Sequence, residues 1–253
     1  MTLELLKGLA WLVISLVLFV YVQRKLHWEI QGVFLLITRR PALSYGLFSL
    51  LFFPGVLLHE LSHFLMARLL RVRTGKLSFL PQVTKDKRLR LGYVETSSSD
   101  KIRDSLIGLA PLISGGAATV LIGIYGLNVL PVAQAASSGD WNAAWTAIKT
   151  IPSVPDFWLW FYLAFTVSST MLPSASDRQA WLPVVLALLG LLLLALLAGG
   201  GPWMLDHLAP GVSDALRALA SLFTLSLGLH LLLLGPVWVV ELGLSRMTNS
   251  QII

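Results

Sequence analysis

The chain has no cysteine and very few charged residues. Of its 253 residues only 13% are charged and 56% are hydrophobic, whereas soluble domains carry about 25% charged residues. The absence of cysteine excludes disulfides and thiolate metal sites, so any metal must be held by His, Asp or Glu. Together with a mean hydropathy of +0.76, this composition excludes an ordinary water-soluble domain and predicts an integral membrane protein.

The net charge of +6 is compatible with a nucleic-acid partner, but no module that combines aromatic and basic residues is visible. We interpret the positive charge as basic loops beside an anionic lipid leaflet. The expected partner is therefore a lipid bilayer and not a nucleic acid. The apolar segment at residues 3–22 has no small-residue cleavage site after it, so we expect a retained membrane helix and not a signal peptide.

Long apolar segments define the expected fold, since about 20 apolar residues cross the hydrocarbon core. Six segments reach or approach this length: residues 3–22, 42–70, 105–130, 157–172, 180–198 and 215–240. Residues 30–37 are too few to span and are expected to lie at the interface or to extend a neighbouring helix. The sequence thus predicts an all-α polytopic membrane protein with about six transmembrane helices. We divide it into an N-terminal helix and connector (1–41), a core (42–180) and two C-terminal helices (181–253).

Two loops differ in charge. Residues 71–104 hold nine Lys or Arg and four acids, whereas residues 131–156 hold one Lys and two Asp. The positive-inside rule places the first loop in the cytoplasm and the second outside, although the basic connector 23–41 departs from this pattern. Within the basic loop, residues 76–80 and 88–96 alternate with period two, which predicts a small membrane-associated β-hairpin. The alternative is an amphipathic loop lying on headgroups.

The second apolar segment contains the motif His59-Glu60-Leu61-Ser62-His63, of the form H-E-x-x-H. On a helix, His59 and His63 lie about 40° apart around the axis and about 6 Å apart along it. Both imidazoles can then reach one Zn²⁺ at about 2.0–2.1 Å. Glu60 is placed to take a proton from the water that the zinc activates. Ionisable residues inside an apolar helix predict a functional site; the alternative is a polar cluster that joins helices.

A catalytic zinc site needs a third protein ligand and an open position. The candidates are His230, Asp156, Asp206, His207, Asp214 and Asp177. We favour Asp177, because it follows the helix-breaking Pro173 and lies on the same side of the membrane as His63. The alternative for Asp177 is a solvated residue paired with Arg178. His230 lies in the middle of an apolar segment and is expected to be a hydrogen-bonded interior residue.

Three short motifs follow one another along the chain: His59–His63, residues 108–114 with the sequence GLAPLIS, and residues 170–177 with the sequence TMLPSASD. Over about residues 42–180 the chain resembles the site-2 protease family of intramembrane metalloproteases, as a divergent member. The resemblance implies that Asp177 is the third zinc ligand. It also implies that Ser114 and Thr170 stand where the family has asparagines that contact substrate, and that the predicted hairpin matches one found in the family.

The expected function is that of a zinc metalloendopeptidase in a multi-pass membrane protein, located in the cell membrane in a prokaryote. It would hydrolyse peptide bonds in a membrane-embedded segment of a transmembrane protein substrate, with Zn²⁺ as cofactor and Glu60 as general base. One alternative is a non-catalytic relative that binds membrane segments, and another is a metal or proton transporter. A zinc protease whose site opens on the membrane surface is a third alternative.

Overall fold

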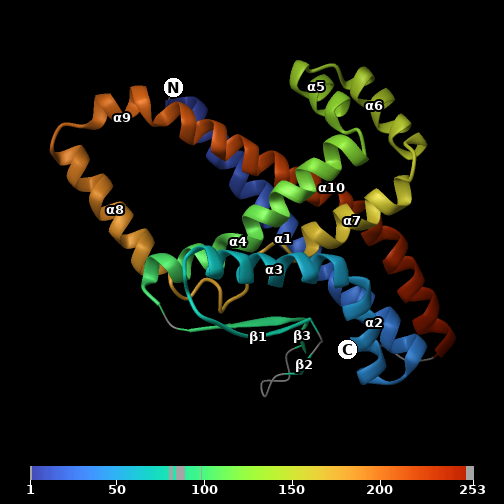
Figure 1. Cartoon of the computed structure of the whole chain (residues 1–253). Coiled ribbons are helices and arrows are strands. Elements are labelled where there is room, and N and C mark those ends of the chain that lie inside the picture. The colour runs from blue at the N-terminus through green and yellow to red at the C-terminus, as the bar shows by residue number, and fades with distance from the viewer. Residues whose placement is uncertain (1, 80–81, 84–88, 98, 249–253) are drawn as a thin grey trace.

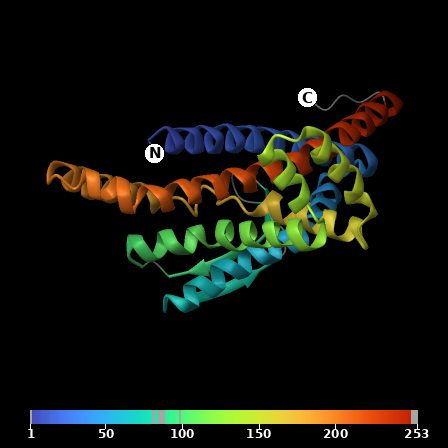
Figure 2. The same ribbon diagram turned by 90° about the horizontal axis from the view of Figure 1, so that it is seen from above.

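The computed structural model describes all residues except 1, 80–81, 84–88, 98 and 249–253. In chain order the elements are α1 (Thr2–Thr38), α2 (Pro41–Leu51), α3 (Phe53–Leu69), β1 (Thr74–Ser78), β2 (Gln82–Val83), β3 (Leu89–Arg90), β4 (Tyr93–Thr96), α4 (Lys101–Leu121), α5 (Leu130–Ser138), α6 (Trp141–Thr150), α7 (Phe157–Thr170), α8 (Trp181–Leu197), α9 (Gly201–His207) and α10 (Ala209–Thr248). A π-helical turn, Ile122–Gly126, extends α4, and a 3-10 turn, Ile151–Ser153, follows α6. The two longest helices, α1 and α10, run side by side in both views (Figures 1 and 2).

Among the described residues, three helices are long and apolar enough to cross a membrane: Leu3–Thr38, Lys101–Gly126 and Ala209–Thr248. The number rises to five if the bent pairs α2–α3 (71°) and α8–α9 (117°) each form one span. Helix α7 has 14 residues and is about 21 Å long, which is shorter than the hydrocarbon core of about 30 Å. The all-α, membrane-type architecture is consistent with the expectation, but the expected count of six spans is not confirmed.

Helix α1 is longer than the first predicted segment. It continues through residues 23–38 without a break, so residues 30–37 extend a neighbouring helix, one of the two alternatives that the sequence left open. The charged residues that follow the predicted segment 3–22 are compatible with a helix. The Nζ atom of Lys25 lies 3.8 Å from Oε1 of Glu29, which is one turn later. Residues 23–41 are therefore mainly helix and not an irregular connector.

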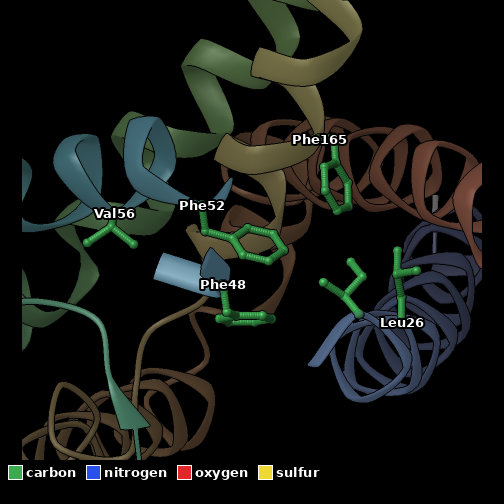
Figure 3. Packing of buried hydrophobic residues seen from close by; sticks show 6 residues of the cluster. Leu26, Phe48, Phe52, Val56 and Phe165 are labelled. Carbon is green, nitrogen blue, oxygen red and sulfur yellow. The ribbon is translucent and has the colours of Figure 1, made fainter. Parts of the chain in front are cut away.

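The second predicted segment is broken at Phe52, between α2 and α3. Pro54 lies in the first turn of α3; it has no N–H to give to the preceding turn and its ring clashes there, which ends α2. Phe48, Phe52 and Val56 at this elbow pack with Leu26 of α1 and Phe165 of α7 (Figure 3). The elbow thus fixes α3 against α1 and α7.

Small residues let the backbones of α3, α4 and α7 approach closely. A side chain at Gly55 of α3 would collide with the carbonyl oxygen of Thr166 and the hydroxyl of Thr170, both on α7. A Cβ at Gly115 of α4 would lie 2.6 Å from the Cβ of Met171. Such contacts are typical of helices that associate in a membrane, where close packing replaces the hydrophobic effect. These three helices form the frame around the site described below.

The basic loop contains two short antiparallel strand pairs, β1 with β4 and β2 with β3. The predicted hairpin is thus present, but the single strand expected over 88–96 is interrupted between β3 and β4, and residues 84–88 lie outside the described residues. Asp100 caps α4, because its carboxylate accepts hydrogen bonds from the backbone N–H groups of Ile102 and Arg103 at 3.1 and 3.0 Å. Helix α4 is thus the next element in the chain after strand β4 (Figure 1).

Residues 131–156 depart from the predicted pattern, whereas α8 nearly coincides with the predicted segment 180–198. Residues 131–156 are mostly helical, in α5 and α6, because Pro131 lies in the first turn of α5 and Asp140 caps α6 by accepting a 2.9 Å hydrogen bond from the N–H of Ala143. Helix α8 is strongly apolar yet has no buried residue, and apart from contacts with α4 it lies away from most of the chain (Figure 1). An apolar helix with so little surface buried against protein is what a lipid environment permits.

Candidate metal centre

Two histidines one turn apart on α3 face a carboxylate from the loop between α7 and α8. The Nε2 atoms of His59 and His63 lie 3.2 Å apart. Asp177 places Oδ1 3.5 Å from Nε2 of His63 and Oδ2 3.8 Å from Nε2 of His59. One potential ligand atom from each residue falls within 4.8 Å of the others. This group could hold a metal ion.

The second nitrogen of each imidazole is bound to a backbone carbonyl. Nδ1 of His59 donates to the oxygen of Thr170 at 2.6 Å, and Nδ1 of His63 donates to the oxygen of Ile107 at 2.8 Å. A carbonyl oxygen only accepts hydrogen bonds, so both Nδ1 atoms carry a hydrogen, and in the neutral form of each ring Nε2 presents a lone pair. Histidine ligands of metals are oriented in this way by their outer hydrogen bonds.

The spacing of the three ligands fits a tetrahedral ion. Ligand atoms bound at about 2.0–2.1 Å in tetrahedral geometry lie about 3.3 Å from one another. The separation of 3.2 Å between the two nitrogens is close to this value, and the separations of 3.5 and 3.8 Å join them to the two different oxygens of Asp177, so a movement of the carboxylate is needed to bring one oxygen close to both nitrogens. Three protein ligands leave a fourth tetrahedral position for water or substrate. The residues therefore fit a catalytic type of metal site.

Asp177 is held in place by its own loop and by α4. The backbone N–H of Ser174 donates to Oδ2 of Asp177 at 2.7 Å. A side chain at Gly108 of α4 would collide with the carbonyl oxygen of Asp177, so glycine lets the loop lie directly on the helix. Burial opposes ionisation of Asp177, but the neighbouring His63 and the hydrogen bonds from Ser174 outweigh it and hold the pKa of Asp177 well below its ordinary value. The carboxylate is thus ionised at neutral pH, as a metal ligand must be.

Arg178, the alternative partner of Asp177, points elsewhere. Its Nε donates to the carbonyl oxygen of Ser174 at 3.2 Å. The proline before this loop also acts as expected, because α7 ends at Thr170, shortly before Pro173. The loop then turns back, and Asp177 reaches the two histidines.

Glu60 lies beside the three ligands but is not one of them. It is buried, and the strand-connecting residue Gly92 passes close to it. A Cβ at Gly92 would lie 2.8 Å from Cγ of Glu60 and 3.0 Å from the carbonyl oxygen of Ser78. The β segment therefore covers the glutamate, and only glycine permits this approach.

A cavity of about 650 Å³ joins the ligands, Glu60 and Gly92. Its other walls come from α1, the start of α4, strand β4 and the loop after α7. The lining includes the exposed residues Thr96, Ser97 and Lys101, so the cavity extends to the molecular surface near the start of α4. The group of His59, His63 and Asp177 is thus connected to the molecular surface by this cavity.

Thr170 and Ser114 occupy different environments. Thr170 lines the cavity and orients His59 through its carbonyl oxygen, while its hydroxyl donates to the oxygen of Thr166 at 3.0 Å. Ser114 is not part of the cavity lining, and its hydroxyl lies 3.5 Å from the oxygen of Pro111. The structure thus brings Thr170, but not Ser114, to the candidate site.

His230 is an interior residue, as predicted. Its Nδ1 donates to the oxygen of Ser226 at 2.7 Å, and the hydroxyl of Ser169 donates to its Nε2 at 2.8 Å. Four other ligand candidates also lie outside the ligand group of the described residues: Asp156, Asp206, His207 and Asp214. His207 is exposed and stacks on Trp203 with ring centroids 4.9 Å apart.

Sequence reasoning did not identify the two carbonyl groups that orient the histidines, because any residue can supply a backbone carbonyl. The glycines at 92 and 108 carried a weak signal, since an isolated glycine often marks a close backbone approach. No family model, curated protein or solved structure matches the chain. Its function therefore has to be argued from the geometry of the site.

Proposed function

We propose that this protein is an intramembrane zinc metalloprotease, a multi-pass protein of the cell membrane that hydrolyses peptide bonds in membrane-embedded segments of other proteins. The observation that carries the proposal is the orientation of His59 and His63. Each has Nδ1 fixed on a carbonyl oxygen, and both Nε2 lone pairs converge on the Asp177 carboxylate. A purely structural polar cluster has no need to turn two Nε2 atoms and a carboxylate toward one point at the edge of a cavity.

The ligand set favours zinc. Two imidazoles and one carboxylate, with no sulfur and an open fourth position, are the donors of known catalytic zinc sites. A bound zinc ion supplies Lewis-acid chemistry, since it lowers the pKa of water and polarises a carbonyl group. The burial of His63 and the partial burial of His59 and Asp177 limit the exposure of the proposed ligands to bulk solvent.

Glu60 provides the acid–base chemistry in this proposal. Its carboxylate lines the cavity next to the ligands without joining them. It accepts a proton as water adds its hydroxyl to the scissile carbonyl carbon. When the C–N bond breaks, Glu60 returns that proton to the leaving amine nitrogen, so the two products are an amine and a carboxylic acid, which then loses its proton to water. Gly92 keeps this glutamate covered and oriented.

The position of the ligands supports a membrane-embedded substrate. His59 and His63 lie in the apolar helix α3, which packs against α4 and α7. A transporter would spread its polar groups along a path through several helices, whereas here the ligands gather at one cavity. A non-catalytic binding protein would have no need for a buried glutamate beside two free lone pairs. Both features favour the protease.

The test is cleavage of a fluorescently labelled transmembrane peptide library by the zinc-loaded protein in detergent micelles. Glu60→Gln should keep its zinc but lose about 10²–10⁴-fold in rate, which is the usual contribution of a general base. Glu241→Gln is a matched control, because Glu241 lies on α10 outside the cavity lining. Activity of Glu60→Gln within tenfold of wild type would defeat the proposal.

A further inference from the structure

One wall of the cavity comes from α1, which supplies none of the metal ligands. His27 of α1 lines the same cavity as His59 and Glu60. Its neighbours Leu26 and Ile30 belong to the buried cluster at the elbow between α2 and α3. Helix α1 is therefore fixed against the site, and the position of His27 is defined by packing.

The imidazole of His27 is held by aromatic rings. Its centroid lies 4.7 Å from that of Phe52 in a tilted arrangement and 5.5 Å from that of Phe48 in an edge-to-face arrangement. Nε2 of His27 is buried and has no hydrogen-bond partner among the described residues. Buried polar atoms in folded proteins nearly always have a partner, so this exception calls for an explanation.

Two other polar side chains that line the cavity do not show the same deficit. The hydroxyl of Ser169 donates to His230, and the hydroxyl of Thr170 donates to the oxygen of Thr166. His27 is also not part of the three-residue ligand group. The ring of His27 lines the cavity apart from the metal-binding group, while its unsatisfied Nε2 is buried behind that wall, so a turn of the ring would bring this nitrogen to a polypeptide that enters the cavity.

We infer that His27 is a substrate-binding residue whose imidazole hydrogen-bonds to the main chain of the polypeptide in the cavity. The inference rests on the proposed function. A membrane segment must unwind before it is cut, and its exposed N–H and C=O groups then need partners away from water. A neutral imidazole offers one donor and one acceptor, so it can satisfy either main-chain group.

Two hydroxamates distinguish whether His27 helps to bind the substrate or helps to bind the metal ion. Both bind a metal ion through the same group, but acetohydroxamate has no peptide chain, whereas leucyl-leucyl hydroxamate extends one into the cavity. Full-length protein loaded with Co²⁺ reports binding through its visible spectrum. His27→Phe preserves the ring contacts with Phe48 and Phe52 and removes the nitrogens, and His27→Gln preserves a hydrogen-bonding group.

For His27→Phe we expect leucyl-leucyl hydroxamate to bind about tenfold more weakly, the effect of one lost hydrogen bond, with acetohydroxamate and cobalt uptake unchanged. His27→Gln should recover most of the affinity. The melting temperature of His27→Phe should not fall, because an unpartnered buried polar atom has been removed. His207→Phe, at an exposed histidine of α9, is the control and should match wild type.

Equal affinity of wild type and His27→Phe for leucyl-leucyl hydroxamate would overturn the inference and leave the proposed function intact. Weaker binding of both hydroxamates by His27→Phe would also overturn it, because His27 would then support the metal. If wild-type protein takes up no cobalt and binds neither probe, the proposed function fails and this inference fails with it. The binding of acetohydroxamate therefore separates the two failures.

Discussion

The Nε2 atoms of His59 and His63 lie 3.2 Å apart, and in the two neutral rings neither carries a hydrogen. Two lone pairs at this distance repel each other unless a proton or a metal ion lies between them. Asp177 brings a negative charge to within 3.5 Å of His63, which further favours a cation. The three side chains are thus arranged to hold a positive charge between them.

The first prediction concerns the two histidines. His59→Ala and His63→Ala should each lose zinc, because the two remaining ligands hold the ion poorly. Elemental analysis of the purified variants measures this directly. His207→Ala, at an exposed histidine of α9, should keep the wild-type content. Stoichiometric zinc in His59→Ala or His63→Ala would show that the two residues do not share one ion.

The second prediction concerns Asp177 and His230. Asp177→Ala should lose both zinc and activity, whereas Asp177→Asn should retain weak binding through its amide oxygen and lose most of its activity. His230→Ala should keep its zinc, because His230 is bonded to Ser226 and Ser169 and does not face the ligands. Zinc content and cleavage rate measured on the same samples check both statements. Loss of zinc from His230→Ala with retention in Asp177→Ala would reverse the assignment.

The third prediction uses the close approach at Gly108. Gly108→Ala should displace the Asp177 loop, since the added Cβ would collide with the carbonyl oxygen of Asp177. We expect a loss of about 1–3 kcal/mol in stability, as for other overpacked sites, together with weaker zinc binding. Gly46→Ala is the matched control, because nothing lies within 4 Å of a Cβ at Gly46 of α2. Thermal unfolding with and without zinc measures both effects, and equal behaviour of the two variants would contradict the role of Gly108.

The fourth prediction concerns orientation in the membrane. The basic loop 71–104 should be cytoplasmic and residues 131–156 should lie outside. The chain has no cysteine, so single cysteines report their position without background. Ser137→Cys should react with a membrane-impermeant maleimide in intact cells, and Lys76→Cys only after lysis; both positions are exposed. Labelling of Lys76→Cys in intact cells would invert the orientation.

The sequence predicted the ligand group because most of its signal is local. His59, Glu60 and His63 lie within five residues on one helix, and Pro173 marks where the chain can turn before Asp177. The carbonyl oxygens of Ile107 and Thr170 could not be predicted, because backbone atoms have no sequence signature. Likewise, the unpartnered nitrogen of His27 emerges only when α1 is seen packed at the elbow.

The sequence predicted the class of the fold but not the residues at which its helices begin and end. We expected the first span to cover residues 3–22, but the charged residues Arg24 and Lys25 that follow it do not interrupt backbone hydrogen bonds, and α1 continues to Thr38. In contrast, the break at Phe52 follows from the missing N–H of Pro54 and lies inside a segment that hydropathy presents as continuous. Hydropathy reports the environment of a segment and not where its helix bends.

The proposed zinc site is tested most directly by an experimental structure of the zinc-loaded protein in which anomalous scattering locates the ion. We predict Nε2 of His59 and His63 at about 2.0–2.1 Å from the ion and an Asp177 carboxylate oxygen at about 2.0–2.2 Å, with no fourth protein ligand. Glu60 should lie beside the ion without binding it. An Asp177 carboxylate more than about 4 Å from the zinc, with another protein group in its place, would contradict the proposed zinc site.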